Sequence, residues 1–527
     1  MAATRALARR AFADARTRTI AFALLFFFAA FAQPRAYESA YPTHADRLRL
    51  ADSFGANEAV RMLYGKPHDL LTTGGYVEWR LGTVAIFAAV FGLLGAVRAL
   101  RAEEETGRAE LVLSGVIGRR SAFVAAMAAV AGGALVLWLA LFLALVAGGL
   151  PGGGSAGLAL ALTLPLPVFA GVGAVASQLA PSRRLAIGIS VAVLVVAFLL
   201  RVVADTSDVG WLRWVTPLGW AEELRPFTGW QPWVLVLPVL ATALLLFVSE
   251  RVMRTRDIGS GLLPAHDTSP PRLRLLSSPL ALAARSEWGG LLAWMIGVGV
   301  SGLIMGVVAD SVASAGISES VRDQVAKLGG GSIATPTGYL GFAFLFFVLA
   351  LSLFACMQMT ATRREEADQR LETLFALPVG RRGWLLGRLL LAVGGGALIA
   401  FTGALLMWAG AASQGVDVSL ARMLEAGLNC LPTALLFLGL AALAFAAVPH
   451  ATAGIAYGLV SVAYVWETFG SIADAPRWLL DLSPFHHVGL VPAEPMRVTA
   501  AVIMVAIALV ASAAAVRLFE RRDLTAS

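Results

Sequence analysis

The chain has 527 residues, of which 58% are hydrophobic and 14% charged, and its mean hydropathy is +0.76. This composition excludes an ordinary soluble globular protein and indicates an integral membrane protein. The net charge of +7 comes from arginines that gather between apolar runs, a pattern that concerns membrane topology and does not suggest nucleic-acid binding.

Apolar runs of about 20 residues recur along the chain, and a helix of that length crosses roughly 30 Å of hydrocarbon. The runs predict helices and not a β-barrel, because barrel strands would be about 10 residues long. An arginine-rich segment at residues 2–18 is expected to lie on the cytoplasmic surface, followed by a retained first span because no cleavage site stands out. The spans predicted for the first half cover residues 19–33, 80–99, 121–149, 158–180, the stretch after 184 up to 200, and 231–249.

Residues 257–284 are rich in glycine and proline, a composition typical of a linker. We therefore divide the chain into a first six-helix half (1–256), a cytoplasmic linker with the start of a second interfacial helix (257–284), and a second six-helix half (285–527). Both termini are then expected in the cytoplasm. The spans predicted for the second half cover about residues 289–309, 339–360, 384–412, 429–448, 452–470 and 496–516.

A charged element interrupts the apolar runs twice. Arg101–Arg120 returns as Arg363–Arg382 at a constant offset of 262. Residues 55–61 also match 316–322, and similar offsets join Thr216-Pro217 to Ser483-Pro484 and Arg256-Asp257 to Arg522-Asp523. The fold predicted is an all-α polytopic membrane protein of about twelve transmembrane helices, arranged as two parallel pseudo-twofold six-helix repeats. The positions of the charged element that are identical are Arg101, Glu103, Glu104, Arg108, Glu110, Gly118, Arg119 and Arg120 with Arg363, Glu365, Glu366, Arg370, Glu372, Gly380, Arg381 and Arg382.

One copy of this element could be a solvated helix end whose arginines set the topology. Two copies that keep glutamates favour a docking surface for a partner that is itself twofold. The chain carries no nucleotide-binding P-loop, because its only lysines, Lys66 and Lys327, lie outside any such motif. We therefore expect a transport subunit that is not an enzyme and binds no cofactor, with energy supplied by another polypeptide.

The two elements, each between the second and third spans of a half, resemble the coupling elements in permeases of type-2 ABC exporters, above all actinobacterial exporters of polyketide antibiotics of the tetronasin type. The resemblance implies a bacterial plasma-membrane protein that binds two copies of a soluble ABC ATPase, which would hold ATP and magnesium. Reversing the charges of Glu104 and Glu366 together is expected to uncouple transport and leave the protein folded. The coupling residues implied are Glu103, Glu104, Arg108, Glu110, Arg119, Glu365, Glu366, Arg370, Glu372 and Arg381.

Charged side chains at membrane depth are costly, so Arg201 and Glu467 near the external face are candidates for a paired outer gate. The alternative is that each side chain extends to the external membrane interface without pairing. Glu222, Glu223 and the pair His486-His487 follow the two turns before the last spans, where a helix could dip into the membrane; no metal site is expected. Residues on spans that line the central cavity in the resembling family, although equally suited to helix packing, are Phe87, Phe91, Phe354, Met357, Tyr464 and Trp466.

The leading hypothesis is the permease subunit of an ATP-driven ABC exporter that moves hydrophobic or amphipathic compounds, drug-like or lipid-like, out of the cell. A secondary transporter is the first alternative, although the spans hold few ionisable residues for a coupling ion. A membrane scaffold that binds an ATPase without transporting is the second. Cys356 and Cys430 lie in or beside apolar runs, where we expect buried thiols and no disulfide.

Overall fold

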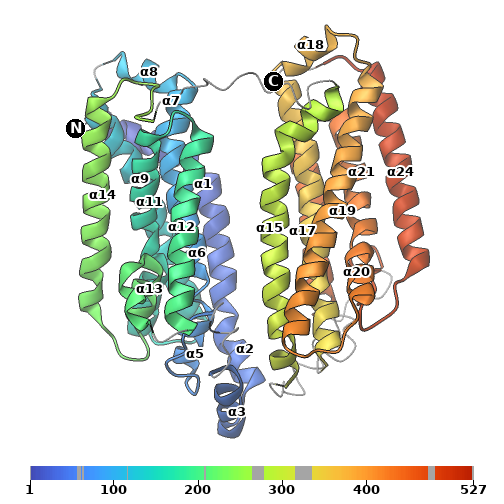
Figure 1. Ribbon diagram of the computed structural model, residues 1–527. Helices are drawn as coiled ribbons and strands as arrows, with labels where there is room; N and C mark the ends of the chain where they lie inside the picture. Colours follow the sequence, from blue (N-terminus) through green and yellow to red (C-terminus); the bar gives the residue numbers. More distant parts are fainter. Residues whose placement is uncertain are drawn as a thin grey trace. The chain divides into compact units, whose positions relative to one another are not determined.

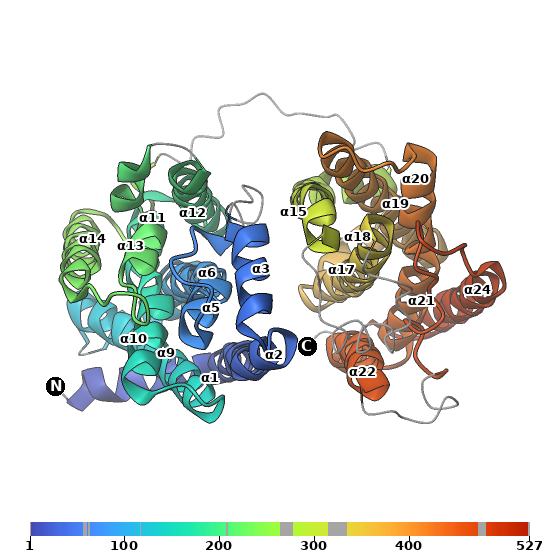
Figure 2. The same ribbon diagram turned by 90° about the horizontal axis from the view of Figure 1, so that it is seen from below.

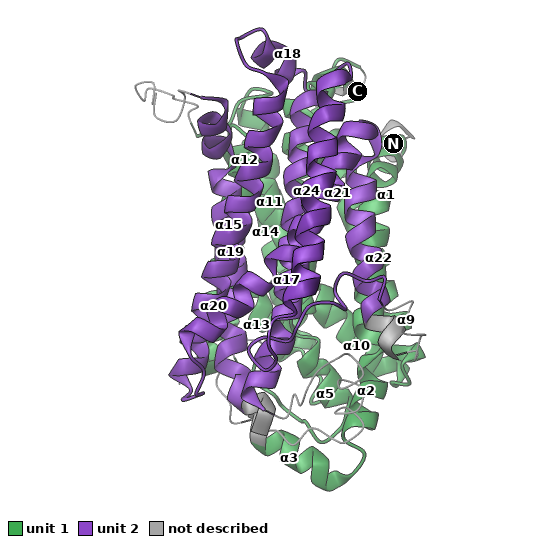
Figure 3. Cartoon of the chain, turned by 90° about the vertical axis from the view of Figure 1, so that its right-hand side faces the viewer, with its two compact units in different colours: residues 1–269 green, residues 270–527 purple. Residues whose placement is uncertain are grey.

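A computed structural model describes residues 2–55, 61, 64–115, 117–206, 209–263, 278–314, 335–472 and 481–524. Within these ranges every regular element is a helix, and eleven helices are long and apolar enough to cross a membrane. The predicted class, an all-α polytopic membrane protein, is confirmed. The chain divides into two compact units, unit 1 (Met1–Ser269) and unit 2 (Pro270–Ser527), coloured separately in Figure 3.

Unit 1 is built on long helices joined by short ones (Figure 1). The main helices of its candidate membrane spans are α1 (Ala2–Phe31), α6 (Val84–Val97), α9 (Arg119–Ala147), α10 (Gly152–Thr163), α11 (Pro165–Leu179), α12 (Arg183–Thr206) and α14 (Val236–Thr255). The short ones are α2 (Gln33–Ala40), α3 (His44–Gly55), α5 (Thr73–Arg80), the π-helical η1 (Arg98–Ala102), α7 (Glu103–Glu105), α8 (Arg108–Leu113), η2 (Gly210–Val215), α13 (Pro217–Glu223) and η3 (Pro232–Leu235).

Unit 2 repeats much of this order. Its helices are α15 (Pro279–Ser314), α17 (Pro336–Ala367), α18 (Arg370–Phe375), α19 (Arg381–Ser413), α20 (Leu420–Asn429), α21 (Leu431–Ala447), η4 (Pro449–Ala451), α22 (Thr452–Ile472) and α24 (Val498–Arg521). The predicted span 452–470 coincides with α22, whose side chains are described as far as Glu467. The predicted match of 55–61 with 316–322 lies largely outside the described residues.

Glycines let neighbouring helices approach closely within each unit. A Cβ on Gly92 of α6 would stand 2.2 Å from the carbonyl oxygen of Leu166 on α11, two helices that lie side by side in unit 1 (Figure 2). In unit 2, a Cβ on Gly306 of α15 would stand 2.1 Å from the carbonyl oxygen of Met407 on α19. Small residues at such contacts are typical of helix packing in membranes, where close backbone approach replaces the hydrophobic effect.

Several boundaries differ from the prediction. The expected change at residue 18 from an interfacial segment to a span does not appear as a break, because α1 runs without interruption from Ala2 to Phe31. The fourth span of each half is longer than predicted and is divided near a proline, Pro165 in unit 1 and Pro432 in unit 2. Proline has no backbone N–H to donate within a helix, so it divides both copies at corresponding places.

Candidate functional site

The two charged elements follow a similar backbone path. In unit 1, α6 passes through η1 into α7, turns at Gly107, and continues as the six-residue α8 before α9 starts at Arg119. In unit 2, α17 ends at Ala367, the chain turns at Gln369, and α18 and α19 follow. Gly107 (φ +70°) and Gln369 (φ +59°) are both left-handed and are 262 residues apart. The sequence repeat therefore extends to an unusual backbone conformation, which favours glycine over other residues.

In unit 1 the second glutamate of the element is held by two arginines. Glu104 accepts from Arg101 at 2.8 Å and from Arg256, just beyond α14, at 2.5 Å. Arg256 also donates to the amide oxygen of Gln178 at 2.7 Å, and its own carbonyl accepts from Arg119 at 2.9 Å. We call Arg101, Glu104, Arg119 and Arg256 the first clamp. It ties the connection between the second and third spans to the end of the sixth.

Unit 2 contains the same arrangement. Glu366 accepts two bonds from Arg522, at 2.7 and 2.8 Å, and lies 3.3 Å from Arg363. Arg381 donates to the carbonyl of Arg522 at 2.6 Å, as Arg119 does to Arg256. Arg363, Glu366, Arg381 and Arg522 form the second clamp. Each member corresponds to one of the first clamp, so both units build the site from the same four residues.

The clamps separate the predicted coupling residues into two groups. The Glu366 side chain is 1% exposed and that of Glu104 14%, so these carboxylates are occupied inside the protein. Reversing the charges of Glu104 and Glu366 would place a positive side chain among arginines that are already there. The structure therefore argues against the prediction that this double variant stays folded. The other predicted coupling residues reach the surface to different degrees. Glu365, Arg119 and Arg381 are half-buried, and Glu365 is engaged in a further ion cluster of unit 2. Those most open to a partner are Glu103, Arg108, Glu110, Arg370 and Glu372.

Sequence reasoning assigned no role to Arg256 and Arg522, which complete the clamps. Both lie about 150 residues from the glutamates they bind, beyond the last span of their unit. The sequence offered one signal for these two arginines, the match of Arg256-Asp257 with Arg522-Asp523. A buried charge that recurs beyond the last span of each unit needs a counter-charge or hydrogen bonds in both units.

Unit 2 has a further ion cluster that involves the first glutamate of its element. Arg388 of α19 is buried between Glu365 and Glu287 of α15 and forms an ion pair with each. In unit 1 the corresponding Glu103 pairs only at the surface, 3.9 Å from Arg108, and its side chain is 43% exposed. The two elements therefore share a buried clamp and differ in their outer parts.

Comparison with known proteins places the chain in a family. A family model described as multidrug efflux system permease Rv1217c, C-terminal domain, matches residues 47–252 and 276–520, one segment in each unit. The chain belongs to this family. The multidrug efflux system permease protein Rv1217c of Mycobacterium tuberculosis (strain ATCC 25618 / H37Rv) is 33% identical over 458 residues, which cover 86% of this chain and 82% of that protein.

In this family member, Arg201 lies in an ion cluster of unit 1 at the end opposite the first clamp. Its Nε is 3.1 Å from Asp205 and 3.4 Å from Glu222, and Asp205 also accepts from Arg213 at 2.7 Å. Burial, together with repulsion from Asp205 and Glu223, raises the pKa of Glu222 to about 8, although Arg201 and Arg213 oppose the shift. Arg201 is thus already satisfied by carboxylates of its own unit.

Glu467, the other predicted gate residue, lies 3.1 Å from the Nδ1 of His486 in unit 2. The predicted pairing of Arg201 with Glu467 stays a prediction, and it would have to compete with these partners. Among the described residues, no three or more His, Cys, Asp or Glu side chains are grouped so that they could hold a metal ion.

The predicted cavity residues are mostly engaged in packing inside their own units. Phe354 is 1% exposed and its ring lies 5.9 Å from that of Trp294, whose Nε1 donates to the sulfur of Met357. Tyr464 packs on Phe485 at 5.5 Å, and Phe91 on Phe22 at 5.3 Å. Trp466 is partly buried, whereas Phe87 is 51% exposed. The packing interpretation accounts for these contacts, and a role in a substrate cavity stays a prediction.

Proposed function

We propose that the chain is the membrane subunit of an ATP-driven, type-2 ABC exporter that moves hydrophobic or amphipathic, drug-like compounds out of a bacterial cell. The observation that carries this proposal is that two matched charged elements are clamped in the same way and present charged residues at the surface. The relation to a multidrug efflux system permease supports the transported class. The charged ends, with both termini, would face the cytoplasm of a plasma-membrane protein.

The exposed residues of the two elements would dock two copies of a soluble ABC ATPase, which binds ATP and magnesium. Arg108 and Glu110 begin α8, and Arg370 and Glu372 begin α18, so each short helix offers both signs of charge. A rigid connection would carry motion of the ATPase into the membrane. The clamps supply one, because each ties its element to the end of the last span of its unit.

A proton-driven transporter is the second candidate, and one observation favours it. Glu222 is half-buried beside Asp205 and Glu223, and its burial together with these two carboxylates raises its pKa to about 8, so it is mostly protonated at neutral pH. This group lies at the end of unit 1 opposite the charged element. In ion-coupled carriers, by contrast, the binding sites lie near the middle of the membrane, which favours the ATP-driven function. A scaffold that binds an ATPase without transport is the third candidate.

Transport in proteoliposomes separates the three. The purified chain is reconstituted with a soluble ABC ATPase that binds it, and accumulation of ethidium is followed with ATP, with a proton gradient, and with neither. We expect accumulation with ATP only when both proteins are present. Accumulation driven by the proton gradient without the ATPase would establish the secondary transporter, and ATP hydrolysis without accumulation would establish the scaffold.

Docking is tested by charge reversal at exposed positions. We expect Arg108→Glu with Glu110→Arg, or Arg370→Glu with Glu372→Arg, to weaken ATPase binding by roughly tenfold or more without changing the unfolding temperature, because charges across an interface set the choice of partner. Asp417→Arg, in an exposed loop at the other end of unit 2, is the matched control. Unchanged binding in both double variants would remove the charged elements as the docking site.

A further inference from the structure

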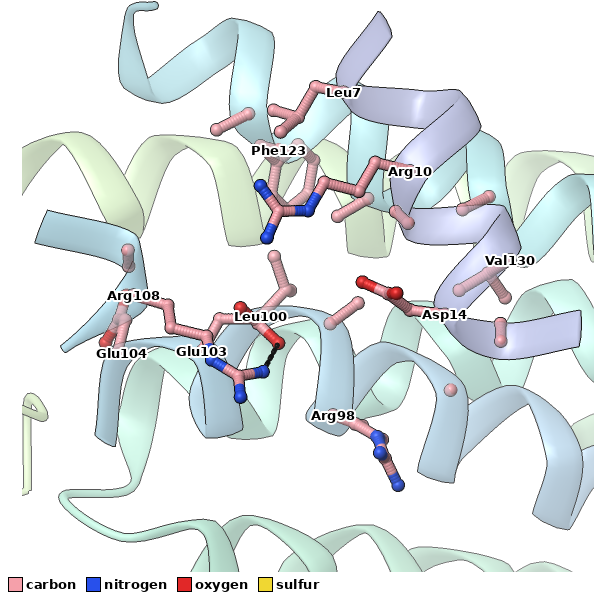
Figure 4. A pocket seen from close by; sticks show the side chains of 18 of the residues that line it. Leu7, Arg10, Asp14, Arg98, Leu100, Glu103, Glu104, Arg108, Phe123 and Val130 are labelled. Atoms are coloured by element: carbon pink, nitrogen blue, oxygen red, sulfur yellow. Dashed lines mark ion pairs between the residues drawn. The ribbon is translucent and has the colours of Figure 1, made fainter. Parts of the chain in front are cut away.

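A cavity of about 340 Å³ opens in unit 1 between α1 and the first charged element, with α9 on a third side. Figure 4 shows Arg10 and Asp14 of α1 pointing into the space that Leu100 and Glu103 border from the opposite side. One stripe of α1 lines this cavity, since the residues follow the helical repeat of three and four positions. That stripe consists of Leu7, Arg10, Ala11, Asp14, Ala15, Arg18, Thr19 and Phe22.

The wall of the cavity carries an excess of positive charge, with six arginines against four carboxylates. Within the first clamp Arg256 is paired with Glu104, and Arg119 donates to the carbonyl of Arg256. At the surface Arg108 lies near Glu103. Among the described residues, the three remaining arginines on α1 and η1 have no ion pair or side-chain hydrogen bond. These are Arg10, Arg18 and Arg98.

The electrostatics strengthen this excess. Arg18 is half-buried and experiences the positive charges of Arg98 and of Arg183 on α12. Like charges repel one another, and the single carboxylate of Asp14 does not balance three arginines, so an anion between them would lower the electrostatic energy. The charged part of the cavity is therefore complementary to an anion.

The other part of the cavity is apolar. Beyond Arg18, α1 becomes a continuous apolar helix, and the cavity follows it to Phe22, whose ring lies 5.3 Å from that of Phe91 on α6. Leu94 and Val130 border the same part. A ligand that satisfies both parts has an anionic head and an apolar chain.

Unit 2 shows why this space is open in unit 1. At the offset of 262, Ala122 and Ala126 of α9 correspond to Trp384 and Arg388 of α19. Trp384 is 5% exposed, and Arg388 is paired with carboxylates of its own unit. At these two positions of the cavity wall, α9 is thus small where its counterpart is large. In unit 2 the protein supplies both charges of the pair, whereas in unit 1 a single carboxylate on the α1 stripe, Asp14, stands beside the three arginines, none of which forms an ion pair among the described residues.

We propose that this cavity binds an anionic membrane phospholipid, with its phosphate against Arg10, Arg18 and Arg98 and the start of its acyl chain beside Phe22 and Phe91. Basic pockets between transmembrane helices are known sites for anionic headgroups. The lipid fills the gap between α1 and the first charged element, so it braces that element as Trp384 and Arg388 brace the second. The anionic lipid content of the leaflet would then set the rigidity of one docking element and not of the other.

Native mass spectrometry of the purified full-length chain in detergent tests this site without any ATPase. Phosphatidylglycerol and phosphatidylcholine with identical acyl chains are titrated, and the bound fraction is measured. We expect phosphatidylglycerol to bind more tightly. Arg18→Gln with Arg98→Gln is expected to weaken its binding by about tenfold or more, because charge-assisted contacts are lost, and to leave phosphatidylcholine unchanged.

A filled cavity provides a second, independent test. Ala122→Trp copies the residue of unit 2 and is expected to abolish the preference for phosphatidylglycerol, whereas Val124→Trp, on the outward side of α9 where Val124 is 50% exposed, is the matched control and is expected to retain it. Circular dichroism and gel filtration verify the fold of each variant. Should Ala122→Trp not fold, the arginine variants decide the matter.

Unchanged phosphatidylglycerol binding by the protein with Arg18→Gln and Arg98→Gln would overturn the proposal, and so would three other results. The first is equal binding of the two lipids by the unchanged chain. The second is an equal loss of phosphatidylglycerol in the Ala122→Trp and Val124→Trp proteins. The third is displacement of phosphatidylglycerol by inorganic phosphate at equal concentration, which would show a site for small anions that makes no use of the apolar part.

Discussion

The charged elements of the two units are alike inside and different outside. Each holds one glutamate between two arginines and turns through one left-handed residue. Around this shared part, unit 1 leaves a cavity lined by unpaired arginines, whereas unit 2 closes the corresponding face with Trp384 and Arg388. The clamp is common to both units because a buried charge needs a counter-charge or hydrogen bonds wherever it occurs. The outer parts are free to differ, and they are where the two halves of a fused repeat can acquire separate tasks.

Breaking a clamp is expected to have the largest effect. Glu104→Gln leaves Arg101 and Arg256, whose side chains are 1% and 4% exposed, without a counter-charge, and a buried charge that loses its partner costs roughly 3–5 kcal/mol of unfolding free energy. Glu366→Gln is expected to cost about as much, since its carboxylate is 1% exposed. Denaturant unfolding in detergent, followed by circular dichroism, measures both.

Glu110→Gln is the matched control for these variants, because Glu110 belongs to the same element and is exposed. Its unfolding free energy should stay within about 0.5 kcal/mol of the unchanged chain. If the three variants behaved alike, the clamps would not be what fixes the charged elements, and the glutamates could be contact residues after all.

The cluster that only unit 2 possesses should give the next largest effect. Arg388→Met leaves Glu287 and Glu365 unpaired, and because these side chains are 21% and 26% exposed, we expect a loss of about 2 kcal/mol, smaller than for a clamp. The triple variant with Glu287→Gln and Glu365→Gln should recover most of that stability, since no charge stays buried. A triple variant less stable than Arg388→Met would mean that packing around Arg388, and not charge, closes this face.

Much of the fold was accessible from the sequence, and the reasons are physical. Hydrocarbon thickness sets the length of the spans, so composition alone predicts helices, and the offset of 262 identifies the repeat. The boundaries were less accessible. A helix can continue from an interface into a span with no signal in the sequence, as α1 does, and the division of the fourth span near Pro165 and Pro432 depends on how its neighbours pack.

The charged elements were located from sequence, but the roles of their residues were not separable. Glu103 and Glu104 are adjacent and of the same type, yet only Glu104 meets Arg256, because contact with the end of α14 depends on how distant helices pack. Periodicity along one helix cannot reveal which face a helix about 150 residues away will cover. The match of Arg256 with Arg522 was the available signal. It becomes informative if each of two corresponding arginines is expected to need a carboxylate partner in its own unit.

The opposite ends of the units differ as well, which predicts a pH dependence. Folding raises the pKa of Glu222 in unit 1 to about 8, above the value of about 4.5 for an exposed glutamate, so the folded chain holds a proton that the unfolded chain releases. Stability should then fall as pH rises between about 5 and 8, by up to about 1.4 kcal/mol per pH unit. Unfolding free energies at pH 6 and 7 measure this slope, which Glu222→Gln should reduce. An unchanged slope in that variant would assign the dependence to another group.

The smallest expected effect concerns the left-handed residue that both elements share. A Cβ at Gly107 would meet no atom within 4 Å, so only its φ of +70° disfavours a side chain, and Gly107→Ala is expected to cost about 1 kcal/mol of unfolding free energy. Gln369 accepts that strain at φ +59°, and Gln369→Gly should gain a few tenths of a kcal/mol, because the flexibility added to the unfolded chain offsets part of the relief. Gly118→Ala is the control, since Gly118 has the same open space but a φ of −74°. Denaturant unfolding measures the loss of unfolding free energy in each variant. Equal losses for Gly107→Ala and Gly118→Ala would show that the turn relaxes to accept a side chain, and the left-handed turn would then be tolerated by the repeat but not required.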